Sequence, residues 1–332
     1  MTAKGKLPGE FDLIARYFAP LSAKAPGALG LKDDACTFAP PAGAELVLTT
    51  DALVADSHFL RTDAADLVAR KLLRVNLSDL AGKGARPLGY LMTTAFDAGV
   101  DEPWLDGFVE GLAHDQAEFD FALWGGDTVA TPGPLALTAT VIGAVPTGRA
   151  LRRDGARPGD RVLVTGTIGD GHFGLAAHRG ALVELGEPAR RFLAQRYLLP
   201  QPRIALGRMV AEQGLAHAGM DISDGLAADL MHMCESSGCG AEIDVARVPV
   251  SDPVAELVAD DPALIAAAVT GGDDYELLLA VPPDRTADAI AAAGQAGIAI
   301  HDIGVFRAQA GAHFLDRDGQ ALTLKKPGFT HF

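Results

Sequence analysis

Apolar and polar residues alternate along the chain in two rhythms, which predict strands and helices in turn. A period of two, typical of half-buried strands, marks residues 45–50, which read ELVLTT. A period near 3.6, typical of helices, marks 63–81. The same criteria predict further strands at 89–96, 121–124, 135–145, 161–165 and 276–281, and further helices at 102–118, 203–217 and 226–234. Strands that alternate with helices predict an α/β architecture in both halves of the chain.

A stretch rich in glycine, proline and arginine interrupts this alternation at 146–160 and is the expected linker. The length of 332 residues agrees with about two domains. We therefore expect an N-terminal domain over 1–148 and a C-terminal domain over 149–332. Hydrophobic residues make up 48% of the chain and charged residues 21%, which is typical of a globular protein and not of a disordered one.

The charge balance narrows the class of partner. Lysine and arginine number 28 against 43 aspartates and glutamates, so the formal net charge is −15. Nucleic acids and anionic membranes attract basic surfaces, and we therefore expect neither as a partner. The negative net charge does not exclude phosphate ligands, because bound metal cations can reverse the local sign of the charge.

Cysteine usage and the length of apolar runs predict the compartment. The three cysteines, Cys36, Cys234 and Cys239, are odd in number and lack CxxC spacing. This usage is typical of a reducing cytoplasm, although pairing of Cys234 with Cys239 stays open. No apolar run approaches the roughly 18 residues of a membrane span, and residues 1–20 lack the features of a signal peptide. We expect a cytoplasmic protein.

The pattern with most chemical content is a set of aspartate motifs that follow apolar strands or adjoin glycine. They are Asp33-Asp34, Thr49-Thr50-Asp51, Asn76-Leu77-Ser78-Asp79, Gly125-Gly126-Asp127, Asp221-Ile222-Ser223-Asp224-Gly225 and Gly271-Gly272-Asp273-Asp274. Any one of them is more often a turn or a cap than a ligand site. Together they favour a shared multi-metal site, because ligand crevices form at strand ends in open α/β sheets. Carboxylates and hydroxyls are ligands that Mg²⁺ prefers, and clustered carboxylates need cations to offset their repulsion.

One further motif points to a different function. Residues 169–174, GDGHFG, match GxGxxG after a predicted strand, which is the context of a dinucleotide-binding turn and would suit an NAD-dependent oxidoreductase. The match stands alone in a chain with 38 glycines, and no second nucleotide-binding half accompanies it. A tight strand-to-helix turn is therefore the favoured interpretation.

Two other groups of polar residues have both structural and functional interpretations. His58 stands in Asp56-Ser57-His58-Phe59, and a histidine so placed is more often a hydrogen-bonded loop residue than a ligand. Arg149, Arg152 and Arg153 lie in the linker and form either a solvated basic patch or a site for a nucleotide phosphate.

Over nearly the whole length, these motifs resemble those of the thiamine-monophosphate kinase family, within the ATP-dependent enzymes typified by aminoimidazole ribonucleotide synthetase. The segments most specific to the kinase are Gly9-Glu10-Phe11, His58-Phe59 and Gly271 to Leu277. The resemblance implies a two-domain α/β (α+β) fold and a homodimer. In it the N-terminal domain, 1–148, binds ATP and Mg²⁺ and pairs its sheet with that of a second subunit. The C-terminal domain, 149–332, closes the cleft.

The resemblance also implies site residues. Those implied as Mg²⁺ ligands are Asp34, Thr49, Thr50, Asp51, Asp79, Asp127, Asp221 and Asp224. Those implied as ATP contacts are Gly126, Asp127, Arg153 and Ser223, and those implied as contacts to thiamine monophosphate are His58, Asp273 and Phe329. Asp273 departs from the family pattern, which usually has glutamate there, one methylene longer.

The implied reaction is transfer of the γ-phosphoryl group of ATP to thiamine monophosphate, which yields thiamine diphosphate. Its acceptor is a phosphate, already largely ionised at pH 7 because its second pKa is about 6. We expect direct transfer, assisted by Mg²⁺ and arginine, with no side-chain nucleophile or base. The rivals are a related ATP-using enzyme with another acceptor, a non-catalytic nucleotide sensor, and the oxidoreductase named above.

Overall fold

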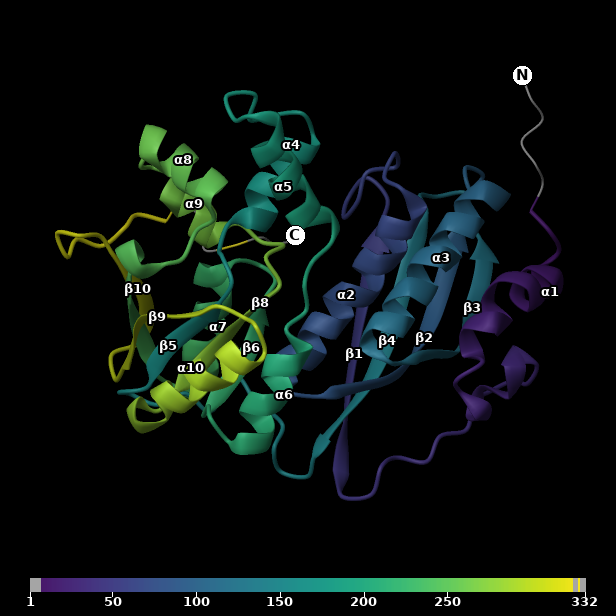
Figure 1. The fold of residues 1–332 in the computed structure, drawn as a ribbon, viewed down its shortest axis with the longest axis horizontal. Coiled ribbons are helices and arrows are strands. Elements are labelled where there is room, and N and C mark those ends of the chain that lie inside the picture. The colour runs from purple at the N-terminus through teal and green to yellow at the C-terminus, as the bar shows by residue number, and fades with distance from the viewer. Residues whose placement is uncertain (1–6, 325–327, 329–332) are drawn as a thin grey trace. The chain divides into compact units, whose positions relative to one another are not determined.

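Two separate sheets organise the computed structural model, which describes residues 7–324 and 328 (Figure 1). They belong to two compact units. The first unit extends to Leu80 and resumes over Arg86–Ala144, and the second takes Ala81–Ala85 and the chain from Val145 onward. The mixture of strands and helices in both units confirms the expected α/β class. The domain boundary expected between residues 148 and 149 stays a prediction, because the division into compact units does not show which function each domain has.

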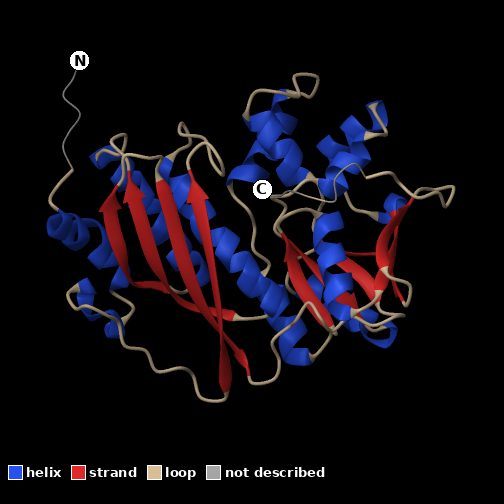
Figure 2. Cartoon of the chain, turned by 180° about the vertical axis from the view of Figure 1, so that it is seen from behind, coloured by secondary structure: helices blue, strands red, loops and turns tan. Residues whose placement is uncertain are grey.

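The first unit contains a four-stranded sheet in the order β1-β4-β2-β3. Its elements are α1 (Glu10–Leu13), the short helical turns Ile14–Phe18, Ala19–Ser22 and Pro26–Leu31, β1 (Ala44–Val54), α2 (Ala65–Lys83), β2 (Arg86–Phe96), α3 (Glu102–Phe119), β3 (Ala122–Ala130) and β4 (Ala136–Pro146). Strand β2 runs parallel to β3 and antiparallel to β4. Figures 1 and 2 show α2 and α3 on one face of this sheet.

Helix α3 shows why the predicted segment 102–118 folds locally. Asp101 caps its N-terminus, with the carboxylate accepting the Trp104 N–H at 3.0 Å. Leu105, Phe108 and Leu112 recur at helical spacing and are buried. The helix ends at Asp120, whose φ of 52° is left-handed.

The second unit contains a six-stranded sheet in the order β10-β7-β9-β5-β8-β6. Its elements are β5 (Arg161–Thr165), α4 (Asp170–His178), α5 (Glu187–Leu198), α6 (Ile204–Gln213), β6 (Ala218–Ile222), α7 (Leu226–Ser237), β7 (Gly240–Asp244), the turn Val245–Arg247, α8 (Asp252–Asp260), α9 (Leu264–Thr270), β8 (Glu276–Val281), the turn Pro283–Arg285, α10 (Thr286–Gln295), β9 (Ile300–Arg307) and β10 (Gly311–Leu315). Only β10 and β7 pair in parallel; every other neighbouring pair that the structure describes in this sheet is antiparallel.

Two strands continue past the C-terminal end that the pattern predicted. Strand β1 continues to Val54, so Asp51 lies within the strand and not after its end. Strand β3 continues through Gly125-Gly126-Asp127, which we expected to follow a short strand. Glycine permits this pairing, because a Cβ on Gly126 would lie 1.8 Å from the Met92 carbonyl oxygen of β2.

A buried ion-pair cluster lies within the second unit beneath the start of β8. Glu276 is 0% exposed and accepts hydrogen bonds from Arg196 Nη2 at 2.8 Å and Arg203 Nε at 2.6 Å. The Thr165 hydroxyl donates to the same carboxylate at 2.6 Å. Arg196 Nε also donates to the buried Asp170 at 3.2 Å. Each buried charge is therefore paired and hydrogen-bonded, as burial requires.

We expect Glu276→Gln to lower the free energy of unfolding by about 3–5 kcal/mol, because it leaves two largely buried guanidinium groups without their carboxylate. Urea denaturation measures the change. Glu242→Gln is the matched control, since its ion pair with Arg307 is about half exposed and should contribute less than about 1 kcal/mol. Equal losses in the two variants would contradict this account of the cluster.

Candidate active site

Strand β1 and helix α2 bring together part of the predicted metal site. The Thr49 hydroxyl donates a hydrogen bond to the Asp79 carboxylate. The N–H of Asp51 donates to Asn76 Oδ1 at 3.1 Å, and Asn76 Nδ2 is held by the Leu72 carbonyl at 2.9 Å. Since side chains alternate along a strand, Thr49 and Asp51 face α2 together. Three of the predicted ligands therefore share one site.

Thr50 lies on the other face of β1. Its hydroxyl donates to the Ala139 carbonyl at 3.2 Å and accepts from the Thr140 hydroxyl at 3.0 Å. The structure therefore does not bring the Thr50 hydroxyl to Thr49, Asp51 and Asp79.

Asp127 also lies far from that group within one chain. Strands β1 and β3 are the two edges of the sheet, with β4 and β2 between them, so they are about 14 Å apart at the usual strand spacing. Asp127 pairs with Thr93 and is exposed, and its carboxylate accepts the Thr128 N–H at 2.9 Å. Gly126 lies beside it on the same edge strand.

Asp34 lies in a bend after the turn Pro26–Leu31 and is exposed. Its N–H donates to Asp33 Oδ1 at 2.8 Å. No hydrogen bond described in the first unit connects it to β1.

His58 lies in the loop that follows β1 and is half-buried. Its Nδ1 accepts the Val54 N–H at 3.0 Å, so the ring proton belongs on Nε2. Lys71 Nζ donates to the His58 carbonyl at 3.2 Å, which ties the loop to α2. Nδ1 therefore acts as predicted from the sequence for a hydrogen-bonded loop residue. The predicted contact between His58 and the substrate stays a prediction, and it would be made through Nε2.

In the second unit, β6, a strand that the periodicity did not predict, ends within the Asp221–Gly225 motif. Asp221 is 7% exposed. The N–H groups of Ser223 and Asp224 both donate to Asp229 Oδ2 at 3.1 Å, which holds the loop at the start of α7. Burial, and next the neighbouring Asp224, raise the pKa of Asp229 to about 7, although its backbone hydrogen bonds act in the opposite direction.

The loop before β8 lies directly beside this motif. The Asp273 N–H donates to the Ser223 carbonyl at 2.9 Å, and the Tyr275 N–H donates to the Ile222 carbonyl at 2.8 Å. Gly272 permits the approach, since a Cβ there would lie 2.5 Å from the Ser223 carbonyl oxygen. The structure therefore brings the predicted substrate residue Asp273 next to the predicted ATP and metal residues Ser223 and Asp224.

The GxGxxG-like turn has a structural role. The N–H groups of Gly169 and Gly171 donate to the two oxygens of the Asp274 carboxylate at 2.8 and 2.9 Å. This carboxylate occupies the position at the N-terminus of α4 that an anionic ligand would take. A Cβ on Gly174 would lie 2.3 Å from the Leu193 carbonyl oxygen of α5. The strand-to-helix interpretation is confirmed, and the turn supplies no open dinucleotide site.

Within the second unit, the structure separates Arg153 from Ser223, another of the predicted ATP contacts. Its carbonyl accepts from the Ser237 hydroxyl at 2.9 Å, at the C-terminal end of α7. Ser223 precedes the N-terminal end of that 12-residue helix, which is about 18 Å long. The Arg153 side chain is exposed. Phe329, the last predicted substrate contact, lies outside the described residues.

Sequence reasoning missed two residues that position the loops, Asp229 and Asp274. Both are aspartates that bind backbone N–H groups; Asp229 belongs to none of the aspartate motifs, and Asp274 belongs to the Gly271–Asp274 motif without a role of its own having been predicted. Asp229 stands in the first turn of the helix after the DxSDG motif, which is a usual place for a carboxylate that caps a loop. Nothing in the sequence distinguishes Asp274 from Asp273, because both follow the same two glycines.

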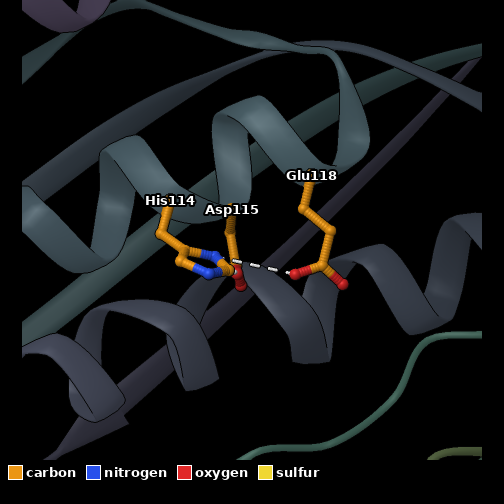
Figure 3. A group of neighbouring side chains, drawn as sticks. All are labelled: His114, Asp115 and Glu118. Atoms are coloured by element: carbon orange, nitrogen blue, oxygen red, sulfur yellow. Dashed lines mark hydrogen bonds and ion pairs between the residues drawn. The ribbon is translucent and has the colours of Figure 1, made fainter.

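The described residues contain one group of histidine and carboxylates close enough to hold a metal: His114, Asp115 and Glu118 on α3 (Figure 3). Asp115 is 0% exposed and is bound by Arg74 Nε at 2.6 Å and Arg70 Nε at 2.9 Å. Glu118 accepts from Arg74 Nη2 at 2.6 Å. The two guanidinium groups already neutralise these carboxylates, so the cluster ties α2 to α3 and is no cation site.

Comparison with family models places both units. The model described as AIR synthase related protein, N-terminal domain, matches residues 32–145, and the corresponding C-terminal domain model matches 157–315.

Whole-chain relatives are more specific. A thiamine-monophosphate kinase of Caulobacter vibrioides is 42% identical over 329 residues, covering 98% of this chain and 91% of the relative. Another, of Salmonella typhimurium, is 43% identical over 327 residues and covers 98% of each.

Solved structures agree with the sequence relatives. The crystal structure of a thiamine-monophosphate kinase from Stenotrophomonas maltophilia is similar with a TM-score of 0.83 and 36% identity, covering 95% of this chain and 98% of that one. A structure of AaThiL complexed with AMPPCP and TMP is similar with a TM-score of 0.77 and 29% identity over all of both chains. By family model, sequence and fold, this chain belongs to the thiamine-monophosphate kinase family of AIR synthase related proteins.

Proposed function

We propose that this protein transfers the γ-phosphoryl group of ATP to thiamine monophosphate and releases thiamine diphosphate and ADP. The observation that carries the proposal is the pair of backbone hydrogen bonds that hold Asp273 beside Ser223 and Asp224. They bring a predicted acceptor contact next to predicted nucleotide contacts. The complex of the relative with AMPPCP and TMP supports the same pair of substrates.

We propose that Mg²⁺ is the metal, held by the carboxylates and hydroxyls named from the sequence. The donors fit this hard cation, because every one of them is an oxygen. Thr49 donates its hydroxyl proton to Asp79 and so keeps its lone pairs for a cation. Bound Mg²⁺ supplies charge neutralisation between two anionic phosphates. The proposed ligands are Asp34, Thr49, Thr50, Asp51, Asp79, Asp127, Asp221 and Asp224.

The residues of this chain would orient the substrates and not react with them. Asp229 and Asp274 fix the two loops that carry Ser223, Asp224 and Asp273, so little conformational entropy is lost when the substrates bind. The acceptor phosphate is itself the nucleophile and is already ionised near pH 7. Direct in-line transfer without a phospho-enzyme follows. The proposed ATP contacts are Gly126, Asp127, Arg153 and Ser223, and the proposed thiamine monophosphate contacts are His58, Asp273 and Phe329.

We also propose a homodimer formed through the first sheet. The face away from α2 and α3 exposes large apolar side chains: Leu46 is 39% exposed, Leu48 64%, Leu91 39% and Val129 45%. Figure 2 shows this face with no helix of the described first unit over it. Exposed apolar side chains on one face of a sheet are typical of a buried interface. A second copy would also offer its own β3 edge to β1, which one chain cannot do.

We also propose that the protein is located in the cytoplasm and binds neither nucleic acid nor membranes. This proposal rests on the net charge of −15 and the cysteine usage. Among the described residues, none of the helices has the length and apolar character that crossing a bilayer demands.

Product analysis tests the reaction. We expect thiamine diphosphate to form in step with ADP, only with thiamine monophosphate and only with Mg²⁺, when the purified protein is incubated with ATP. Chromatography of the products measures both. ADP without thiamine diphosphate would indicate another acceptor, and a phosphorylated protein after incubation with ATP alone would contradict direct transfer.

We expect Asp51→Asn and Asp127→Asn each to lower kcat about 100-fold or more, because each removes a negative ligand of the proposed metal site. Thermal unfolding should remain close to that of the parent. Glu256→Gln, an exposed carboxylate on α8, is the control and should leave kcat unchanged. Near-normal kcat for either variant at saturating Mg²⁺ would show that the metal-site assignment is wrong.

We expect Leu48→Glu to convert the dimer to monomer, because it introduces a charge into the proposed apolar interface. Light scattering coupled to size-exclusion chromatography measures the mass. Val183→Glu is the matched control, since Val183 is 76% exposed in the second unit and lies outside the sheet. A parent protein that is already monomeric would overturn the homodimer.

A further inference from the structure

Helix α4 begins against the loop that carries Asp273. A Cβ on Gly171 would lie 2.3 Å from the Asp273 carbonyl carbon and 2.8 Å from its Cβ. A Cβ on Gly271 would lie 2.3 Å from the Cβ of His172 and 2.8 Å from its Nδ1. The His172 imidazole is therefore packed on the backbone of the glycine loop, two residues before Asp273.

Three features keep this arrangement in place. Asp274 binds the N–H groups of Gly169 and Gly171, which fixes the first turn of α4 to the loop. Asp273 itself has a left-handed φ of 71°, a conformation that is costly for aspartate and persists only where the surroundings hold it. The His172 ring packs edge-on to Phe173 at 5.1 Å between centroids. The Cβ of Asp273 thus lies against Gly171 and the Cβ of His172 lies against Gly271, so both residues adjoin the same turn, and both reach solvent.

The electrostatics of this pair define what it can bind. Asp273 repels a phosphate and attracts a cation or an amine. The pKa of His172 is lowered because partial burial outweighs the attraction of Asp273, which favours the neutral ring near pH 7. A neutral imidazole can stack on a heteroaromatic ring or exchange hydrogen bonds with its amine. Together the two groups suit a heteroaromatic, amine-bearing cation and do not suit a phosphate.

We propose that His172 is a further substrate-binding residue, which together with Asp273 contacts the heteroaromatic, amine-bearing end of thiamine monophosphate. This inference rests on the proposed function. Asp273 is one methylene shorter than the glutamate of the family pattern and therefore offers the substrate less contact area. The His172 imidazole supplies further contact area with the substrate at that position. His172 binds the acceptor and takes no part in the transfer of the phosphoryl group.

Steady-state kinetics on the full-length protein test the proposal. His172→Ala should raise KM for thiamine monophosphate about tenfold, a typical effect of one lost substrate contact. KM for ATP and kcat should both stay within twofold of the parent. The matched control is His232→Ala, an exposed histidine on α7, which should change none of these values. A purely structural role would instead lower the unfolding temperature and change both KM values together.

A double-mutant cycle tests the pairing with Asp273. If both side chains contact the same part of the substrate, their effects on KM should not be independent. The double variant His172→Ala/Asp273→Asn should then raise KM by a factor at least threefold smaller than the product of the factors of the two single variants. A KM for thiamine monophosphate within twofold of the parent in His172→Ala would overturn the proposal, and so would independent effects in the cycle. His172→Gln replaces His172→Ala if the alanine variant does not fold.

Calorimetric binding of thiamine monophosphate separates this proposal from the proposed function. The parent should bind thiamine monophosphate in the presence of Mg²⁺, and His172→Ala should weaken that binding about tenfold. If the parent binds but forms no thiamine diphosphate, the kinase assignment fails and the role of His172 in binding still holds. If the parent does not bind, or the variant binds equally well, the proposed role of His172 is wrong.

Discussion

The second unit depends on buried carboxylates that bind backbone N–H groups in place of an external ligand. Asp229 holds the loop of Ser223 and Asp224, and Asp274 holds the turn of Gly169 and Gly171. A loop N–H without an acceptor costs free energy when it is buried, so these carboxylates set the path of the chain. Both loops are anchored in this way, and backbone hydrogen bonds hold Asp273 beside Ser223. Pre-organisation of this kind favours phosphoryl transfer, because little conformational entropy is then lost on binding.

The first unit follows a different constraint, the geometry of its sheet edges. Thr49, Asp51 and Asp79 gather where β1 meets α2, while Asp127 occupies the opposite edge strand. No rearrangement of one chain joins these edges while β4 and β2 remain between them. The same sheet leaves apolar side chains exposed on its outer face. The proposed homodimer would account for both facts, since a second copy would cover the face and supply the missing edge.

Charge is distributed unevenly through this acidic protein. Some of its buried acids are compensated by guanidinium groups, as at Glu276 and Asp115. Among the aspartates proposed as ligands, Asp79 accepts a hydrogen bond from the Thr49 hydroxyl. A carboxylate that is already neutralised by arginine binds a cation less readily. For this reason the His114 cluster, which has the spacing of a metal site, is better explained as a tie between α2 and α3.

The sequence by itself determined the order of strands and helices in the first half, a part of that order in the second half, the aspartate motifs and the family that they resemble; strands such as β6, β7, β9 and β10 were not predicted. Periodicity is local, so segments such as 102–118 and 161–165 were predicted close to their observed bounds. The tertiary structure decided that Asp51 and Asp127 lie within strands, that Thr50 faces away from Thr49, and that Asp274 fills the glycine turn. It also placed His172 against the loop of Asp273. These outcomes depend on which strands become sheet edges and which loops pack together. Pairing between residues far apart in the chain determines them, and no local pattern records it.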